Sequence, residues 1–93
     1  MITFAKKIKS MRYIKDITNN KFKVSLYQWN NKYIIKVESG TYEQTYKIDQ
    51  YEVADAEEIE KCVDDEFLES VERRFDIMNN DFLESLKRNE VIF

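Results

Sequence analysis

Apolar and polar side chains alternate along three consecutive stretches in the first half of the chain. Residues 21–29, 32–38 and 41–48 each place an apolar residue at every second position, with Gln44 as a polar interruption of the last stretch. A period of two residues is typical of a half-buried β-strand. The pattern therefore predicts a three-stranded antiparallel β-meander with one apolar face.

Two short turns set the expected register of this meander. Asn30-Asn31 separates the first two stretches, and asparagine tolerates the positive φ that a two-residue hairpin turn requires. Ser39-Gly40 separates the second and third stretches, with glycine supplying the left-handed position. The resulting cross-strand pairs are apolar on one face and of opposite charge on the other: Leu26 with Ile35, Val24 with Val37, Lys23 with Glu38, Val37 with Tyr42, and Lys36 with Glu43.

A fourth strand is expected before the meander, over about residues 12–18. Pairing across Asn19-Asn20 sets Tyr13 opposite Leu26 and puts Lys15 on the apolar face. A lysine in that position suits an edge strand, because it discourages further strand pairing. The N-terminal segment, residues 1–11, could form a short helix over residues 3–10.

From Asp55 onward the period changes to three or four residues. Asp55 followed by Glu58 resembles a capping box at a helix start. The apolar positions then form one helical stripe: Ile59, Val63, Phe67, Val71, Phe75 and Met78. The spacing predicts a long helix over about 56–78. A break is expected at residues 79–80, followed by a shorter helix over about 82–88.

These elements together predict an α+β fold with an antiparallel sheet of three to four strands, residues 12–48, closed over by the helical part, residues 55–88. The chain has no proline and a single glycine at position 40. No linker or repeat divides it, so residues 1–93 are expected to form one domain.

The long helix is expected to overhang its own sheet. It would span ~35 Å, whereas an eight-residue strand spans ~26 Å. The overhang would carry Phe75, Met78 and Phe82, which a homodimer with paired helices or sheets would cover. The alternative is that the second helix folds back and covers them within one chain.

Composition limits the class of protein. Hydrophobic residues make up 43% of the 93 residues and aromatic residues 14%, which is too apolar for a disordered chain. No apolar run approaches the ~20 residues needed to cross a bilayer. The lone cysteine, Cys62, precludes an internal disulfide and is expected to pack near the sheet. We expect no secretory signal, no membrane partner and a cytoplasmic location.

The charges are divided unequally along the chain. Residues 1–36 carry nine Lys/Arg and one acidic residue, whereas residues 37–93 carry six Lys/Arg and seventeen acidic residues. The net charge of −3 therefore conceals a basic first half and an acidic second half. Such asymmetry can attract an oppositely charged partner surface.

The sequence contains few of the residues and motifs that common catalytic sites use. It has no histidine, which removes the commonest general base and zinc ligand. It has no P-loop, no GxGxxG and no CxxC motif. We predict no catalytic residue, cofactor or metal site. A carboxylate enzyme, with or without a divalent metal, would need a pocket holding two or more of Asp64, Asp65 and Glu69, which we expect to face solvent.

The outer face of the predicted sheet combines aromatic and basic side chains. Trp29 is expected opposite Lys32, with Lys47 next in the same row and Tyr27 in the neighbouring row. Rings that stack on bases and ammonium groups that meet phosphates would suit single-stranded nucleic acid. The alternative is an ordinary amphipathic face with cross-strand ion pairs.

The order of elements resembles the Whirly and Pur-alpha families of single-stranded nucleic-acid-binding proteins. The resemblance covers about residues 12–78 and rests on the strands RYIKDIT, KFKVSLYQW, KYIIKVE and TYEQTYKI, followed by the helix from Asp55. It implies nucleic-acid binding through the sheet face and dimerisation through the helix. No family motif is matched residue by residue.

Three functional hypotheses follow from the sequence. The first is a non-enzymatic homodimeric module that binds another protein or organises an assembly. The second is single-stranded DNA or RNA binding on the outer sheet face. The third is the carboxylate enzyme. The apolar C-terminus, residues 91–93, could dock into the core, pair as an edge strand or bind a partner.

Overall fold

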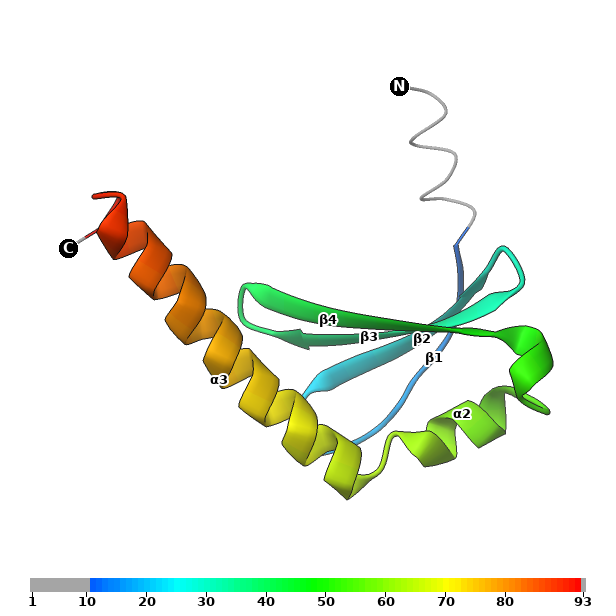
Figure 1. The fold of residues 1–93 in the computed structure, drawn as a ribbon. Helices are drawn as coiled ribbons and strands as arrows, with labels where there is room; N and C mark the ends of the chain where they lie inside the picture. Colours follow the sequence, from blue (N-terminus) through cyan, green and yellow to red (C-terminus); the bar gives the residue numbers. More distant parts are fainter. Residues whose placement is uncertain (1–10, 93) are drawn as a thin grey trace.

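A four-stranded antiparallel sheet followed by helices forms the predicted α+β architecture in the computed structural model, which describes residues 11–92 (Figure 1). The strands lie in chain order in the sheet: β1 (Arg12–Asp16), β2 (Lys23–Trp29), β3 (Lys32–Ser39) and β4 (Tyr42–Asp49). A short 3-10 helix, η1 (Gln50–Glu52), leads to α2 (Ala56–Cys62) and α3 (Asp65–Arg88). The helix expected over residues 3–10 lies outside the described residues.

The first hairpin has the predicted turn and register. Asn30 and Asn31 both adopt positive φ, at 53° and 61°, as a two-residue hairpin turn requires. The β2–β3 pairing runs from Trp29 opposite Lys32 to Lys23 opposite Glu38. Asparagine at both central positions thus fixes this register locally.

The predicted register of the second hairpin is wrong by two residues. The turn is Gly40-Thr41, so Ser39 pairs with Tyr42 and Lys36 lies opposite Thr45. Gly40 takes the first central position, with φ 58°, where glycine is favoured in one common hairpin turn. This arrangement spares Ser39 a positive φ. A shift of two residues keeps every side chain on its predicted face.

The predicted register of β1 is also wrong. Asp16 lies opposite Ser25 and Lys15 opposite Leu26, and a bulge then sets Tyr13 opposite Tyr27. The bulge adds one residue to β1, and it therefore moves Tyr13 from the expected inner face to the outer face.

The cause is a longer loop between β1 and β2 than the two-residue turn expected. Asn19 organises this loop through its side chain: Oδ1 accepts hydrogen bonds from the amides of Lys21 and Phe22, at 2.9 and 2.8 Å. Its Nδ2 donates to the Ile17 carbonyl at 3.0 Å. An asparagine side chain that bonds the backbone in this way favours a turn over continued strand pairing.

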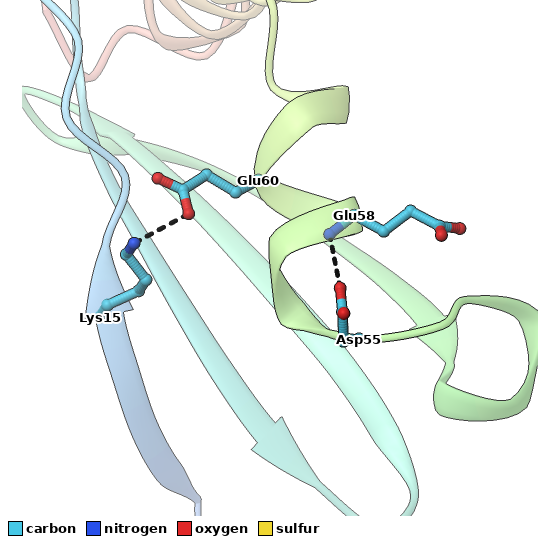
Figure 2. A network of polar contacts seen from close by, with 4 residues as sticks. All are labelled: Lys15, Asp55, Glu58 and Glu60. Carbon is cyan, nitrogen blue, oxygen red and sulfur yellow. Dashed lines mark hydrogen bonds and ion pairs between the residues drawn. The ribbon is translucent and has the colours of Figure 1, made fainter.

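The helical part breaks earlier than predicted. Asp55 caps α2 as expected, since its carboxylate accepts a hydrogen bond from the Glu58 amide at 3.0 Å (Figure 2). The chain then leaves the helix at Val63, and Asp64 caps α3 by accepting from the Phe67 amide at 2.8 Å. Helix α3 continues through Asn79, so the expected break at residues 79–80 is wrong.

Helices α2 and α3 cover one face of the sheet, which we call the inner face (Figure 1). The core joins both layers: Ile17, Val24, Leu26, Ile35, Val37, Ile59, Leu68, Val71 and Phe75. The polar interruption Gln44 is buried there as well. Its side-chain amide nitrogen, Nε2, donates to the Val71 carbonyl at 2.9 Å, and its Oε1 accepts from the Tyr46 hydroxyl, so both ends of the amide are satisfied.

An ion pair ties the β1 edge to the helical layer. The Lys15 ammonium donates to Glu60 on α2 at 2.8 Å (Figure 2). Lys15 thus lies on the predicted inner side of the edge strand, and its ammonium group contacts a carboxylate. This contact raises the pKa of Lys15, chiefly through the hydrogen bond to Glu60.

Candidate interaction surfaces

The aromatic and basic residues predicted as a binding surface lie together on the outer face of the sheet, opposite α2 and α3. Trp29 stands beside Lys32, and Tyr27 stands in the row that contains Ile34 and Lys47. Lys47 was expected in the Trp29 row, and that detail is wrong because of the shifted β3–β4 register. The four predicted residues nevertheless share one face.

Acidic neighbours offset much of the positive charge on this face. Lys32 forms an ion pair with Asp49, which the corrected register places directly opposite it. The Lys23 ammonium lies 4.0 Å from Glu38. Among residues 11–92, the ion pairs of the structure involve neither Lys36 nor Lys47. These two lysines are therefore the cations of the outer face with the least neutralised charge.

Two aromatic rings of the outer face, those of Tyr13 and Tyr27, pack against each other. Tyr13 meets Tyr27 edge to face, with ring centroids 5.8 Å apart, and the Lys36 ammonium lies 5.4 Å from the Tyr27 ring centroid. Ile34 beside them is 2% exposed. Sequence reasoning missed Tyr13 here, because the β1 bulge has no signature in the alternation of side chains. It paired Lys36 with Glu43, whereas the structure sets Lys36 opposite Thr45.

Tyr13 has a perturbed hydroxyl on this face. Partial desolvation raises the pKa of Tyr13, and its contact with Asp16 raises it further. Because Tyr13 is 53% exposed, this raised pKa does not mark an enclosed acid–base site.

Helix α3 leaves the sheet after its contact with the start of β4 (Figure 1). The Tyr42 hydroxyl donates to Asn79 Oδ1 at 3.1 Å, and the rings of Tyr42 and Phe82 meet edge to face at 6.5 Å. Residues 83–88 continue beyond this anchor as one helix. The alternative in which a second helix folds back over the first is therefore wrong.

The exposed apolar side chains of this part of α3 differ in part from those predicted for the overhang. Phe82 is 55% exposed and Ile77 58%. Met78 is half-buried against the core. The expectation that Phe75 is wet is wrong: it is 6% exposed and packs on Phe22 at a ring distance of 5.3 Å. The early helix break at Val63 explains this, because it leaves Phe75 in the middle of α3.

The helix ends in a left-handed cap. Glu90 adopts φ 60°, and the Val91 amide donates to the Leu86 carbonyl at 2.8 Å, as in helix C-caps of this kind. Val91 is 64% exposed. Of the predicted C-terminal segment, residues 91–92 form no strand, and Phe93 lies outside the described residues.

The edge of β4 faces two hollows on the inner side of the sheet. A shallow one lies between β4 and α3 and is lined by Gln44, Thr45, Tyr46, Arg74, Ile77 and Met78. A cleft of about 220 Å³ lies between β4 and the α2–α3 joint, and its walls include Tyr46, Ile48, Val53, Cys62 and Phe67. Both hollows border the same strand and have mainly apolar walls.

Reactive and metal-binding groups are sparse on these surfaces. Cys62 is exposed, so the expectation that it packs near the sheet is wrong in part: it is one of the residues that line the cleft. Asp64 is engaged as the cap of α3, and Asp65 and Glu69 face solvent. Within residues 11–92, no group of three or more cysteine or acidic side chains could hold a metal ion.

Comparisons with known proteins add no family to this description. No protein-family model, no curated protein and no solved structure matches the chain. In the part of the chain that the structure describes, no helix is long and apolar enough to cross a membrane. The resemblance to the Whirly and Pur-alpha families stays a prediction from the order of elements.

Proposed function

We propose that this protein is a small non-enzymatic homodimeric module that binds another protein or organises an assembly. The observation that carries the proposal is the presence of large exposed apolar side chains on α3 where this helix leaves the sheet. Phe82 and Ile77 are both more than half exposed. Large apolar side chains grouped on one projecting element are typical of an interaction surface.

The architecture supports this proposal. A 93-residue chain has little interior relative to its surface, so a second copy is an effective source of additional burial. Continuous helix from Asp65 to Arg88 also holds the apolar positions in a fixed geometry. A rigid apolar surface loses little conformational entropy on association.

The experiment is the molecular mass as a function of concentration, measured by sedimentation velocity from about 1 to 100 µM. We expect a dimer for the unmodified chain. Phe82→Glu places a charge in the proposed contact, so we expect it to raise the dissociation constant at least tenfold.

A matched control separates this effect from added charge. Asn80→Glu adds the same charge two residues away on an exposed helical position, and we expect it to leave the dimer intact. Circular dichroism confirms that both variants fold. A monomeric mass for the unmodified chain at 100 µM would overturn the homodimer.

The outer face of the sheet favours a second candidate, single-stranded nucleic-acid binding. Its supporting observation is the placement of Tyr27, Trp29 and Lys47 on one face with Lys36. Titration with a single-stranded oligonucleotide at low salt should then quench Trp29 fluorescence, and added salt should reverse the quenching. Because Trp29 is the only tryptophan, the variants are compared by the anisotropy of a labelled oligonucleotide. Binding that persists unchanged in Trp29→Ala and in Lys47→Glu would exclude this face as the site.

A further inference from the structure

Strand β4 ends the described sheet with a free row of backbone groups. It is the last strand in the order β1-β2-β3-β4. Ser39 and Tyr42 flank a two-residue turn and form the first cross-strand pair, so in such a hairpin they exchange backbone hydrogen bonds. Backbone bonding to β3 therefore recurs at every second residue of β4, starting at Tyr42. At the other end of β4 the Gln50 amide fits this alternation, because it donates to the Asn31 carbonyl at 2.9 Å.

This alternation decides which groups of β4 face outward from the sheet edge. Even-numbered residues of β4 bond to β3, so the backbone amides and carbonyls of the odd-numbered residues point away from it. The side chains of these same residues lie on the outer face: Glu43, Thr45, Lys47 and Asp49. An edge of eight residues with unpaired backbone groups is a template for another strand.

The charges along this edge are complementary to a second copy of itself. When two β4 strands pair antiparallel with Thr45 on a two-fold axis, Glu43 of each copy lies opposite Lys47 of the other. Both residues of each such pair direct their backbone groups toward the partner strand. The same register therefore forms the backbone hydrogen bonds and pairs the opposite charges. A two-fold interface requires this self-complementarity.

Other registers lack this agreement. An axis through Glu43 or Lys47 sets each of these residues against itself, and a shift that pairs Glu43 with Asp49 opposes two carboxylates. A shift that pairs Glu43 with Thr45 leaves the charges of Glu43 and Lys47 without an opposite charge across the interface. The register centred on Thr45 forms two ion pairs and opposes no like charges.

The same pairing would fill the apolar hollows beside the strand. It sets Tyr46 of one copy next to Gln44 of the other, over the shallow hollow that Ile77 borders. It also sets Tyr42 of one copy next to Ile48 of the other, at the cleft between β4 and the α2–α3 joint. These two apolar surfaces beside β4 would thereby become part of one interface.

Helix α3 leaves the sheet at the end of β4 that this pairing would bring beside the second copy. The contact of Phe82 with Tyr42 fixes it at the start of β4, and antiparallel pairing brings that end beside the end of the other β4. There Tyr51 of η1 is 81% exposed and Ile48 36% exposed. The overhang and the strand edge therefore belong to one continuous surface.

We infer that two copies of this chain join through their β4 edges into one eight-stranded antiparallel sheet, with Thr45 on the two-fold axis and Glu43 paired with Lys47 of the other copy. This inference rests on the proposed homodimer and assigns its interface. The occupant of the edge is a second copy because the edge is charge-complementary to itself.

Reciprocal charge variants test the pairing. We expect Glu43→Lys and Lys47→Glu each to raise the dissociation constant about tenfold, and the double variant to return it to within about twofold. Glu43→Lys should not unfold the chain, since Glu43 lies opposite Glu38 within each copy. Lys23→Glu, on the interior strand β2, reverses the charge of a lysine that contacts neither Glu43 nor the edge and serves as the control.

Disulfide trapping tests the register in a Cys62→Ser background. Thr45→Cys should form a covalent dimer under mild oxidation, because paired residues on adjacent strands have Cα atoms about 5.5 Å apart. Glu43→Cys alone should not, since its two copies would lie roughly 13 Å apart. A mixture of the Glu43→Cys and Lys47→Cys proteins should again cross-link.

The outcomes separate this inference from the proposed homodimer. Reciprocal rescue together with cross-linking at Thr45 supports the β4 pairing. If the charge variants leave the dissociation constant of the dimer unchanged and Thr45→Cys does not cross-link, the β4 pairing is wrong, while the proposed homodimer remains supported. A monomeric mass for the unmodified chain overturns both.

Discussion

Asp64 begins α3 with a single side-chain contact. Its carboxylate accepts a hydrogen bond from the Phe67 amide at 2.8 Å, and that amide has no carbonyl partner within the helix. The negative charge also lies at the positive end of the helix dipole. Val63 just before it has left the helical conformation. One carboxylate therefore stabilises the joint between the two helices.

Replacing this cap should measurably destabilise the protein. We expect Asp64→Ala to lower the free energy of unfolding by about 1 kcal/mol, because the first turn of α3 loses a hydrogen-bond acceptor. Asp64→Asn keeps an acceptor and should lose less. Urea denaturation measures both differences.

Asp65→Ala provides the control for this prediction. Asp65 is an exposed residue of the first turn and shares the favourable position near the helix dipole without being the N-cap. A loss as large as that of Asp64→Ala would show that charge at the helix start, and not the cap, carries the effect.

Single residues explain where sequence reasoning succeeded and where it did not. One type of two-residue hairpin turn requires positive φ at both central positions, and asparagine tolerates this conformation. The consecutive residues Asn30 and Asn31 therefore predicted the first hairpin correctly. Gly40 fits either central position of a two-residue turn, and its position in the turn could not be read from the sequence. The sheet face on which Tyr13 lies depends on the β1 bulge, which follows from the loop around Asn19. The alternation of apolar and polar residues does not indicate such a bulge.

At the scale of elements, the faces of the sheet were more predictable than its register. The error in the second hairpin was two residues, which moves partners along a strand without turning any side chain over. Tyr27, Trp29, Lys32 and Lys47 consequently share the predicted outer face. The predicted neighbours changed, and Lys32 gained Asp49 as its partner.

The helices show the limit of local start and stop signals. Both Asn79 and Asn80 are weak helix formers, which made a break there plausible. In the structure Asn79 accepts a hydrogen bond from Tyr42 on the neighbouring layer, so a tertiary contact engages the residue that local propensity disfavours. The actual break at Val63 follows from the cap at Asp64, whose signal was hidden among several consecutive acidic residues.

For the whole molecule, the division of charge along the sequence becomes an attraction between layers. The basic half of the chain forms most of the sheet and the acidic half forms the helices. Lys15 of β1 pairs with Glu60 of α2, and Lys21 in the β1–β2 loop lies 3.6 Å from Glu72 of α3. Both ion pairs join the sheet layer to the helical layer across the edge of the core.

The Lys15–Glu60 pair gives this attraction a pH dependence with a defined sign. The pKa of Lys15 is raised above its ordinary value of 10.5, mainly by the hydrogen bond to Glu60. A raised pKa in the folded state means that the pair stabilises the protein fully below about pH 10.5 and loses its contribution as the pH rises through the folded pKa. Lys15→Met should therefore lower the urea midpoint at about pH 8 and have little effect at about pH 12.

Lys15→Arg distinguishes this loss of charge from general alkaline unfolding. A guanidinium keeps its charge at about pH 12, so this variant should retain the contact with Glu60 and become more stable than the unmodified chain there. Both variants keep a long side chain over the β1 edge, so packing changes little between them. A difference between Lys15→Met and the unmodified chain that stays constant from pH 8 to 12 would show that the methylene stem, and not the ion pair, joins β1 to α2.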